Sequence, residues 1–317
     1  MILFFHGVNT GIDDPRVQML HMDRVRFVGF MKSLRRHHRV ISVDELADCL
    51  ESGSQPPMDA VVLTFDDGYL NNLTIVAPIM QSLGLPWSVF VSSRHISESL
   101  RFPSYIARVA IYYTEKAEAS LPGLPKTISL RTPAARDDAC RAVSALLKTT
   151  SLSEVERMRE ALHSLLPEQR WSELNERFLS DQVMTWDQVR QLSRAGARIG
   201  AHCHDHAVLH EAQGDDEVWR QVRLSKALIE QQVGECRHFV YPNGKWSDIC
   251  PAALVALRQT DFRTAMTTVP GFINHSSMPL LLPRFSFETI EQLRRGCARA
   301  RFAEITGQRL PAVSMLR

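Results

Sequence analysis

The sequence predicts an α/β protein with an irregular (β/α)7 barrel, because apolar runs and amphipathic stretches alternate along most of its 317 residues. Short apolar runs bounded by turn residues are predicted to be buried strands, with 262–267 as the weakest of them. The stronger runs are 2–5, 40–43, 60–65, 87–91, 197–202 and 238–241. Strands that alternate with helices favour a parallel sheet, and about seven repeats favour a barrel or a nearly closed one.

Helical periodicity fills most of the intervals between these strands. Apolar residues recur at the spacing of one helix face in 23–37, 43–51, 70–83, 186–195, 215–233 and 288–301. The last stretch predicts a C-terminal helix at about 288–306. The basic residues of 294–302 are expected to form its solvated face; the alternative is a patch that meets acidic lipid headgroups or a partner.

The alternation is interrupted between about residues 100 and 181. Three stretches in this interval, 103–119, 133–148 and 151–166, have the pattern of helices. A segment of this length is too long for a loop and too regular for disorder. We therefore predict a single domain over residues 1–317 that carries a helical insertion at about 100–181.

Composition and charge argue against several classes of protein. Hydrophobic residues make up 44% of the chain, enough for a sizeable core. The formal net charge is only +2, so no global field favours nucleic acid as a partner. None of the 6 cysteines forms a CxxC pair, which argues against a zinc knuckle and against a disulfide framework.

The N-terminal residues do not have the pattern of a targeting signal. The apolar run at 2–5 is short, and no basic stretch precedes it, in contrast to a signal peptide or a membrane anchor. The sequence therefore predicts a cytoplasmic protein without an integral membrane segment.

Two adjacent aspartates, Asp66 and Asp67, follow the apolar run 60–65. Like charges at close range disfavour joint ionisation unless a cation or a proton compensates them. Because aspartate and glycine are common in turns, a purely structural interpretation of Asp66-Asp67-Gly68 is a turn. The alternative is a pair of carboxylates that work at a strand end.

Four histidines fall within 202–210, just beyond another predicted strand. His202 and His206 are spaced so that both could face one metal ion, and imidazole with carboxylate is a normal ligand set for zinc and related ions. His204 is expected to point away from that pair. A single histidine is more often a satisfied polar group than a ligand, but a cluster opposite a doubled aspartate favours a metal site.

These motifs together resemble the polysaccharide deacetylases, the carbohydrate esterase group that shares the NodB homology domain. TFDDGY at 64–69 resembles the first motif of the family, and GAHCHDHAVL at 200–209 resembles the second. FVYPNG at 239–244 resembles the third more loosely, and the similarity extends from Met1 to about Glu288. The resemblance implies the barrel-like NodB fold, here with a helical insertion.

The resemblance also implies roles for individual residues. Asp67, His202 and His206 match the metal ligands of the family, and Asp66 matches its general base. The ion would be one divalent metal, zinc in the first place, with iron, cobalt or nickel as alternatives. A backbone N–H near Asn243 would stabilise the oxyanion, as the third motif does in the family.

Two motif positions depart from the family pattern. Cys203 stands where serine or threonine is usual in the second motif. Val240 stands where the third motif carries an arginine that orients the base, and Arg284 is the candidate replacement.

The usual C-terminal motif that supplies the catalytic acid is not evident. His275 lies among polar residues and proline, whereas His6 ends the first predicted strand, as in a subgroup of the family that begins with a histidine-bearing strand. We predict that His6 protonates the leaving amine; the alternative is that it only shapes the pocket. Tyr69 and Tyr241 adjoin the motifs and are expected to line that pocket.

The resemblance implies a metal-dependent hydrolase that removes an N-acetyl group from an amino sugar of a polysaccharide, oligosaccharide or glycolipid precursor. One alternative is a hydrolase of the same fold that acts on a linear or cyclic amide. The other is a carbohydrate-binding protein that has lost catalysis, suggested by the altered second and third motifs. The four central residues are intact, which favours an enzyme.

Overall fold

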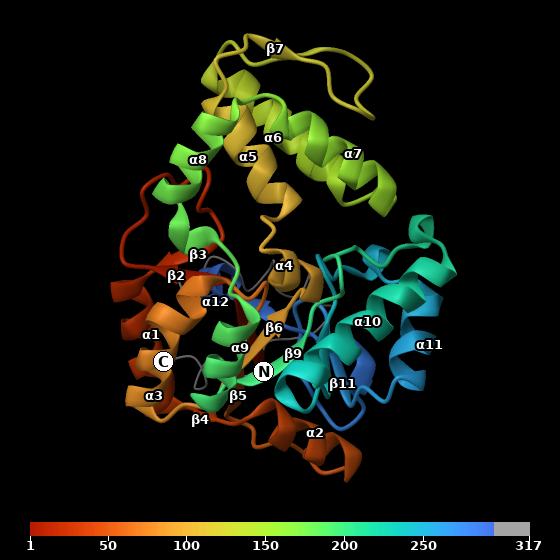
Figure 1. The fold of residues 1–317 in the computed structure, drawn as a ribbon. Helices are drawn as coiled ribbons and strands as arrows, with labels where there is room; N and C mark the ends of the chain where they lie inside the picture. Colours follow the sequence, from red (N-terminus) through yellow and green to blue (C-terminus); the bar gives the residue numbers. More distant parts are fainter. Residues whose placement is uncertain (295–317) are drawn as a thin grey trace.

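The computed structural model describes residues 1–294 and shows a curled parallel sheet with helices packed around it (Figure 1). The strand order is β11-β10-β9-β6-β5-β1-β12, with β4 paired to β5. The strands are β1 (Ile2–Phe5), β4 (Arg39–Val40), β5 (Ala60–Phe65), β6 (Ser88–Val91), β9 (Arg198–Ala201), β10 (His238–Val240), β11 (Thr264–Met266) and β12 (Phe285–Ser286). Every pairing within this sheet is parallel, as the alternating sequence pattern predicts.

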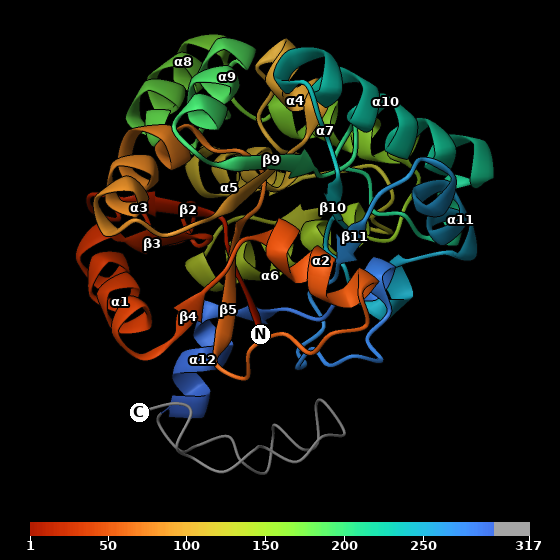
Figure 2. The same cartoon turned by 90° about the horizontal axis from the view of Figure 1, so that it is seen from below.

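One segment, residues 282–286, reaches both edges of the curled sheet. Its end forms β12 and pairs with β1, while Leu282 forms a parallel bridge to Met266 of β11. The Leu282 N–H donates to the Ala265 carbonyl at 2.9 Å. In the view from below, β4, β5, β9, β10 and β11 form an arc, and α1, α3, α10 and α11 lie outside it (Figure 2). The barrel-like α/β class predicted from the sequence is therefore confirmed.

Eight helices belong to the described part of the barrel, and some of them begin or end at a capping residue. They are α1 (Arg24–His37), α2 (Val43–Glu51), α3 (Ala77–Leu83), α4 (Ser93–Glu98), α9 (Trp186–Arg194), α10 (Asp215–Val233), α11 (Pro251–Gln259) and α12 (Phe287–Arg294). The Asp23 carboxylate accepts from the first N–H groups of α1, and Gly234 ends α10 in the left-handed conformation.

Several predicted boundaries are wrong. The predicted strand 40–43 pairs only at Arg39–Val40, because Ser42 forms a capping box with Glu45 and α2 begins at Val43. The predicted helix 70–83 starts with a π-helical turn, Asn72–Val76, before α3. Helices α4 and α11 were not expected from the periodicity. Most of the predicted C-terminal helix and its basic stretch lie outside the described residues.

The interrupted part of the sequence forms four helices and a small hairpin, which lie together above the sheet in Figure 1. They are α5 (Pro103–Tyr113), α6 (Pro133–Leu147), α7 (Leu152–His163), α8 (Glu168–Arg177), β7 (Glu118–Ala119) and β8 (Ile128–Ser129). A separate group of buried apolar residues, including Val109, Val143 and Leu162, holds the helices together.

The insertion differs from the prediction in two ways. The stretch 103–119 is not one helix: α5 ends at Tyr113, and the following Thr114 hydroxyl donates to the Leu165 carbonyl at 2.9 Å. Helix α8 was missed because its sequence is strongly polar, with only Trp171 and Leu174 buried.

The remaining short elements join these parts. They are the parallel pair β2 (Gly7–Asn9) and β3 (His21–Asp23), and the 3-10 turns Leu179–Asp181, Glu211–Gln213, Trp246–Asp248 and Pro279–Leu281. Within residues 1–294, no helix combines the length and apolar character needed to cross a bilayer.

Packing between strands β6 and β9 can be tested with a pair of glycine substitutions. A Cβ atom at Gly200 would lie 2.4 Å from Cε1 of Phe90 and 2.8 Å from the His238 carbonyl oxygen. We expect Gly200→Ala to lower the free energy of unfolding by about 1–3 kcal/mol because it overpacks the core. Gly29 in α1 has open space around it, so Gly29→Ala is expected to raise that free energy by about 0.5–1 kcal/mol. Chemical denaturation measures the free energy of unfolding of both variants. Equal changes in the two variants would contradict the argument that Gly200 is required by close packing.

Candidate functional site

The motif residues lie at the carboxyl ends of neighbouring parallel strands. Asp66 and Asp67 follow β5, and His202 follows β9, with β6 between the two strands. Because parallel strands end at the same edge of a sheet, side chains from distant parts of the chain meet there. The structure thereby brings together Asp66, Asp67, His202 and His206.

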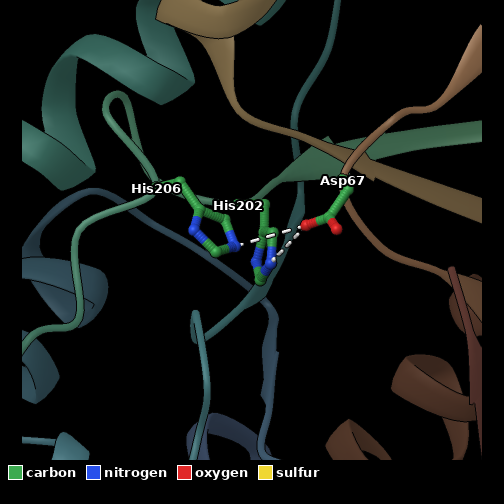
Figure 3. A group of neighbouring side chains, drawn as sticks. All are labelled: Asp67, His202 and His206. Atoms are coloured by element: carbon green, nitrogen blue, oxygen red, sulfur yellow. Dashed lines mark ion pairs between the residues drawn. The ribbon is translucent and has the colours of Figure 1, made fainter. Parts of the chain in front are cut away.

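Asp67, His202 and His206 point their ligand atoms toward one another (Figure 3). The Asp67 Oδ1 atom lies 3.5 Å from Nε2 of His202 and 3.2 Å from Nε2 of His206. Zinc bound tetrahedrally at its usual bond lengths would set its ligand atoms about 3.3 Å apart. Within residues 1–294, Asp67 Oδ1 is buried without a hydrogen bond of ordinary geometry. The three residues therefore fit a divalent metal ion.

Neighbouring groups orient the two histidines. His202 Nδ1 lies 2.8 Å from the Val240 carbonyl oxygen, which can only accept, so Nδ1 carries the proton and Nε2 is free to bind a metal. The ring of His206 packs edge-on against Phe102 at 4.9 Å between centroids. His204 turns away and contacts the Ser93 hydroxyl through Nδ1 at 2.8 Å.

The charge states also suit metal binding, which requires a carboxylate and neutral imidazoles. Burial favours the protonated form of Asp67, but the adjacent His202 and His206 outweigh it and lower its pKa well below the usual value. Burial lowers the pKa of His206, which favours the neutral ring.

The backbone is strained at the site. Asp67, Cys203, His206 and Asn243 have φ angles of +75°, +61°, +55° and +59°, in the left-handed region. Such a conformation costs a non-glycine residue about 1–3 kcal/mol and persists only where the surroundings impose it. The contacts around these positions therefore outweigh the cost of the strain.

Asp66 forms a buried ion pair with Arg284. Arg284 is fully buried, and its Nη1 and Nη2 atoms each donate to one carboxylate oxygen of Asp66 at 2.8 Å. Its Nε donates to the Thr267 carbonyl at 2.8 Å. Although burial alone would raise the pKa of Asp66, the Arg284 guanidinium lowers it below the usual value. Arg284 is thus placed to orient Asp66 rather than to touch a substrate.

His6 lies next to Asp66, because Phe5 of β1 pairs with Phe65 of β5 in parallel register. A positive charge at His6 would be felt by both Asp66 and Asp67. His275 lies elsewhere, with Nδ1 at 2.7 Å from Nε2 of the exposed Gln55, which precedes β5. Of the two histidines considered for the catalytic acid, the structure places only His6 beside the carboxylates.

The two tyrosines that are expected to line the pocket are both buried. Tyr69 is only 2% exposed and packs against His21 and Phe102. Tyr241 is 1% exposed, and its hydroxyl donates to the Leu280 carbonyl at 2.9 Å. Both rings are packed in the core because other parts of the chain cover them, so neither offers a face on which a sugar could stack.

Asn243 lies in the loop after β10, and its side chain is engaged within that loop. Its Nδ2 donates to Asp248 Oδ2 at 2.6 Å, and its carbonyl accepts from the Thr268 hydroxyl at 2.5 Å. No residue within 1–294 accepts from the Asn243 backbone N–H. The backbone rather than the side chain of Asn243 is therefore the group free to meet a ligand.

Sequence reasoning missed a buried charged residue, Asp205, which lies between His202 and His206 in the chain. Asp205 accepts from Arg94 Nη1 at 2.9 Å and from Gln221 Nε2 at 2.6 Å. The available signal was an aspartate inside a short segment with three histidines and a cysteine, but its partners lie on distant helices.

Comparisons with known proteins give a family match and several similar folds. The family model described as polysaccharide deacetylase matches residues 53–264, more than half of the chain. His6 and Arg284 lie outside that match. A comparison with curated proteins finds no match.

Solved deacetylase structures share the fold at low sequence identity. IcaB from Ammonifex degensii is 15% identical with a TM-score of 0.60, over 94% of this chain and 95% of that one. Streptococcus pyogenes deacetylase PplD in complex with acetate is 14% identical with a TM-score of 0.58, over 90% and 91%. The BpsB deacetylase domain from Bordetella bronchiseptica is 14% identical with a TM-score of 0.52, over 90% and 94%.

The Arg284–Asp66 pair can be tested through stability. We expect Arg284→Gln to lower the free energy of unfolding by about 3–5 kcal/mol, because it leaves a buried carboxylate unpaired. Arg177→Gln, which removes the exposed pair with Asp13, should cost about 0–1 kcal/mol. Chemical denaturation at neutral pH measures the free energy of unfolding of both variants, and equal losses would contradict the importance of the buried pair.

The loss of stability in Arg284→Gln should depend on pH, because the pKa of Asp66 is lowered in the folded wild-type protein. A carboxyl group whose pKa is lowered by folding stabilises the protein above its unfolded-state pKa of about 4 and loses that contribution as the pH falls. The difference in free energy of unfolding between the wild-type protein and Arg284→Gln should therefore become smaller under acid conditions. A difference that is constant with pH would show that the loss is one of packing alone.

Proposed function

The chain belongs to the polysaccharide deacetylase family, and on that premise we propose that it hydrolyses the N-acetyl group of an amino sugar with one divalent metal ion. The substrate would be a polysaccharide, an oligosaccharide or a glycolipid precursor. The observation that carries the proposal is the convergence of Asp67, His202 and His206 beside an ionised Asp66. The cytoplasmic location expected from the sequence stays a prediction, which fractionation of cells would test.

Asp67, His202 and His206 would hold the ion, most readily zinc. The bound metal would polarise the acetamide carbonyl and lower the pKa of a water molecule, since three protein ligands leave a coordination position open. Iron, cobalt or nickel would suit the same ligands.

Asp66 would act as the general base. It is ionised, lies next to the ligand Asp67 in the chain and is oriented by two hydrogen bonds from Arg284. Its carboxylate would take the proton of the attacking water as the new C–O bond forms. The N–H of Asn243, for which residues 1–294 supply no acceptor, would donate to the oxyanion that develops on the carbonyl oxygen.

His6 would act as the general acid. Its place at the end of β1, beside Asp66, puts it at the same edge of the sheet as the ligands. A protonated imidazole there could give its proton to the amine nitrogen as the C–N bond breaks. Free acetate and the amino sugar would then leave.

The overall activity is tested by acetate release from N-acetylglucosamine oligomers. We expect release by the zinc-reconstituted protein, and none from a chelated sample or an Asp66→Asn variant. If zinc binds but no acetate appears, a different amide is the substrate. Glycan binding without metal and without turnover would support the non-catalytic alternative.

The role of His6 is tested by pH profiles of kcat/KM. We expect His6→Ala to lower kcat by about 10²–10⁴-fold and to remove the basic limb, because that limb reports loss of the protonated acid. His275→Ala is the matched control and should behave as the wild-type protein, since that side chain contacts Gln55 at the surface. Normal turnover with an unchanged profile in His6→Ala would exclude the acid role.

A further inference from the structure

Asp205 lies between the two histidine ligands with its side chain only 3% exposed. Its two carboxylate oxygens accept from Arg94 and from Gln221, and Arg220 also donates to it. Gln221 of α10 holds the residue twice, because its Oε1 accepts from the Asp205 backbone N–H at 2.7 Å. Both oxygens are therefore engaged by other side chains, and within the described residues Asp205 is not part of the group formed by Asp67, His202 and His206.

Arg94 of α4 holds the same loop at a second point. Its backbone N–H donates to the His204 carbonyl at 2.9 Å, while its Nη1 donates to Asp205. The Ser92 hydroxyl also donates to the His204 carbonyl, at 2.9 Å. The first turn of α4 and the side of α10 thus fix the loop 203–205 from two directions.

Arg94 also connects this loop to the helical insertion. The Nη1 atom that binds Asp205 lies 3.1 Å from Oε1 of Glu156 on α7. A second contact lies nearby, where the Leu152 N–H at the start of α7 donates to Gln213 Oε1 at 2.9 Å. A continuous chain of charged hydrogen bonds therefore runs from α7 to the residue between the ligands.

The loop needs such support because its backbone is strained. Cys203 and His206 both have left-handed φ angles, and Asp205 lies between them. Positions of this kind keep their conformation only where the surrounding contacts outweigh the cost. Two side chains of the loop anchor it: His204 contacts the Ser93 hydroxyl of α4, and the Asp205 carboxylate contacts both α4 and α10.

From this geometry we propose that Asp205 is a positioning residue for the metal site, and that Arg94 couples it to α7 of the insertion. The inference rests on the proposed metal site. Metal binding and the contact of α7 with the loop 203–205 then depend on the same interactions. A bound metal would stabilise the contact of α7 by the same free energy by which that contact strengthens metal binding. The insertion acts on the metal-binding loop itself.

The first test measures zinc affinity of the metal-free protein by competition with a chelator. We expect Asp205→Asn to weaken zinc binding by about 10–100-fold, as loss of a group that orients metal ligands does. Asp44→Asn is the matched control, because Asp44 pairs with His238 and Arg198 away from the ligands, and it should bind zinc as the wild-type protein does.

The second test uses surface substitutions on α7 that do not endanger folding. Glu156→Gln should weaken zinc binding by about twofold to fivefold, whereas Glu160→Gln on the same helix, which has no ion pair within the described part of the chain, should leave it unchanged. Zinc should also slow backbone hydrogen exchange in α7, and Asp205→Asn should reduce that protection.

The outcomes separate the inference from the proposed function. If the wild-type protein binds no zinc, the proposed metal site fails. If it binds zinc and Asp205→Asn binds it equally well, the positioning role is wrong. If Glu156→Gln and Glu160→Gln are indistinguishable and zinc leaves exchange in α7 unchanged, the coupling to the insertion is wrong.

Discussion

The guanidinium of Arg284 donates to both carboxylate oxygens of Asp66 in the buried interior of the barrel. Arg284 belongs to the segment 282–286 that reaches both edges of the sheet, and Asp66 directly follows the strand β5. Burying either charge alone would cost several kcal/mol, so neither is tolerated without the other. The same pair thus fixes the closing segment against β5 and keeps the proposed base ionised and oriented.

The negative charge of Asp67 is not compensated in the way that the charge of Asp66 is. Asp66 is neutralised by Arg284, whereas Asp67 is buried beside two imidazoles and has no permanent cation within the described residues. Two adjacent buried carboxylates therefore leave one negative charge to be balanced. A divalent cation at this point would balance it, and the spacing of the three ligand atoms suits one. The charge argument thus supports the proposed metal without any reference to relatives.

The sequence allowed prediction of those features that depend on short-range pattern. Apolar runs followed directly by Asp66-Asp67 or by His202 predict both the strand and the position of the motif at its end, since parallel strands share one polar edge. Arg284 was predicted as the partner of Asp66, and the structure makes that contact. Features that depend on distant contacts could not be predicted in this way. The burial of Tyr69 and Tyr241 depends on helices and loops packed over them, and α8 has too polar a sequence to show an apolar face.

The network around Asp205 belongs to this second group and shows why the insertion matters. An aspartate among histidines suggests a further ligand, yet its oxygens are taken by Arg94, Arg220 and Gln221 from two helices. Arg220 and Gln221 belong to α10, whereas Arg94 of α4 also contacts Glu156 on α7, and the positioning role proposed for Asp205 rests on these contacts. An insertion that only covered a substrate would need no charged link to the loop beneath it. The link, together with the strained backbone at Cys203 and His206, indicates that the insertion supports the geometry on which metal binding would depend.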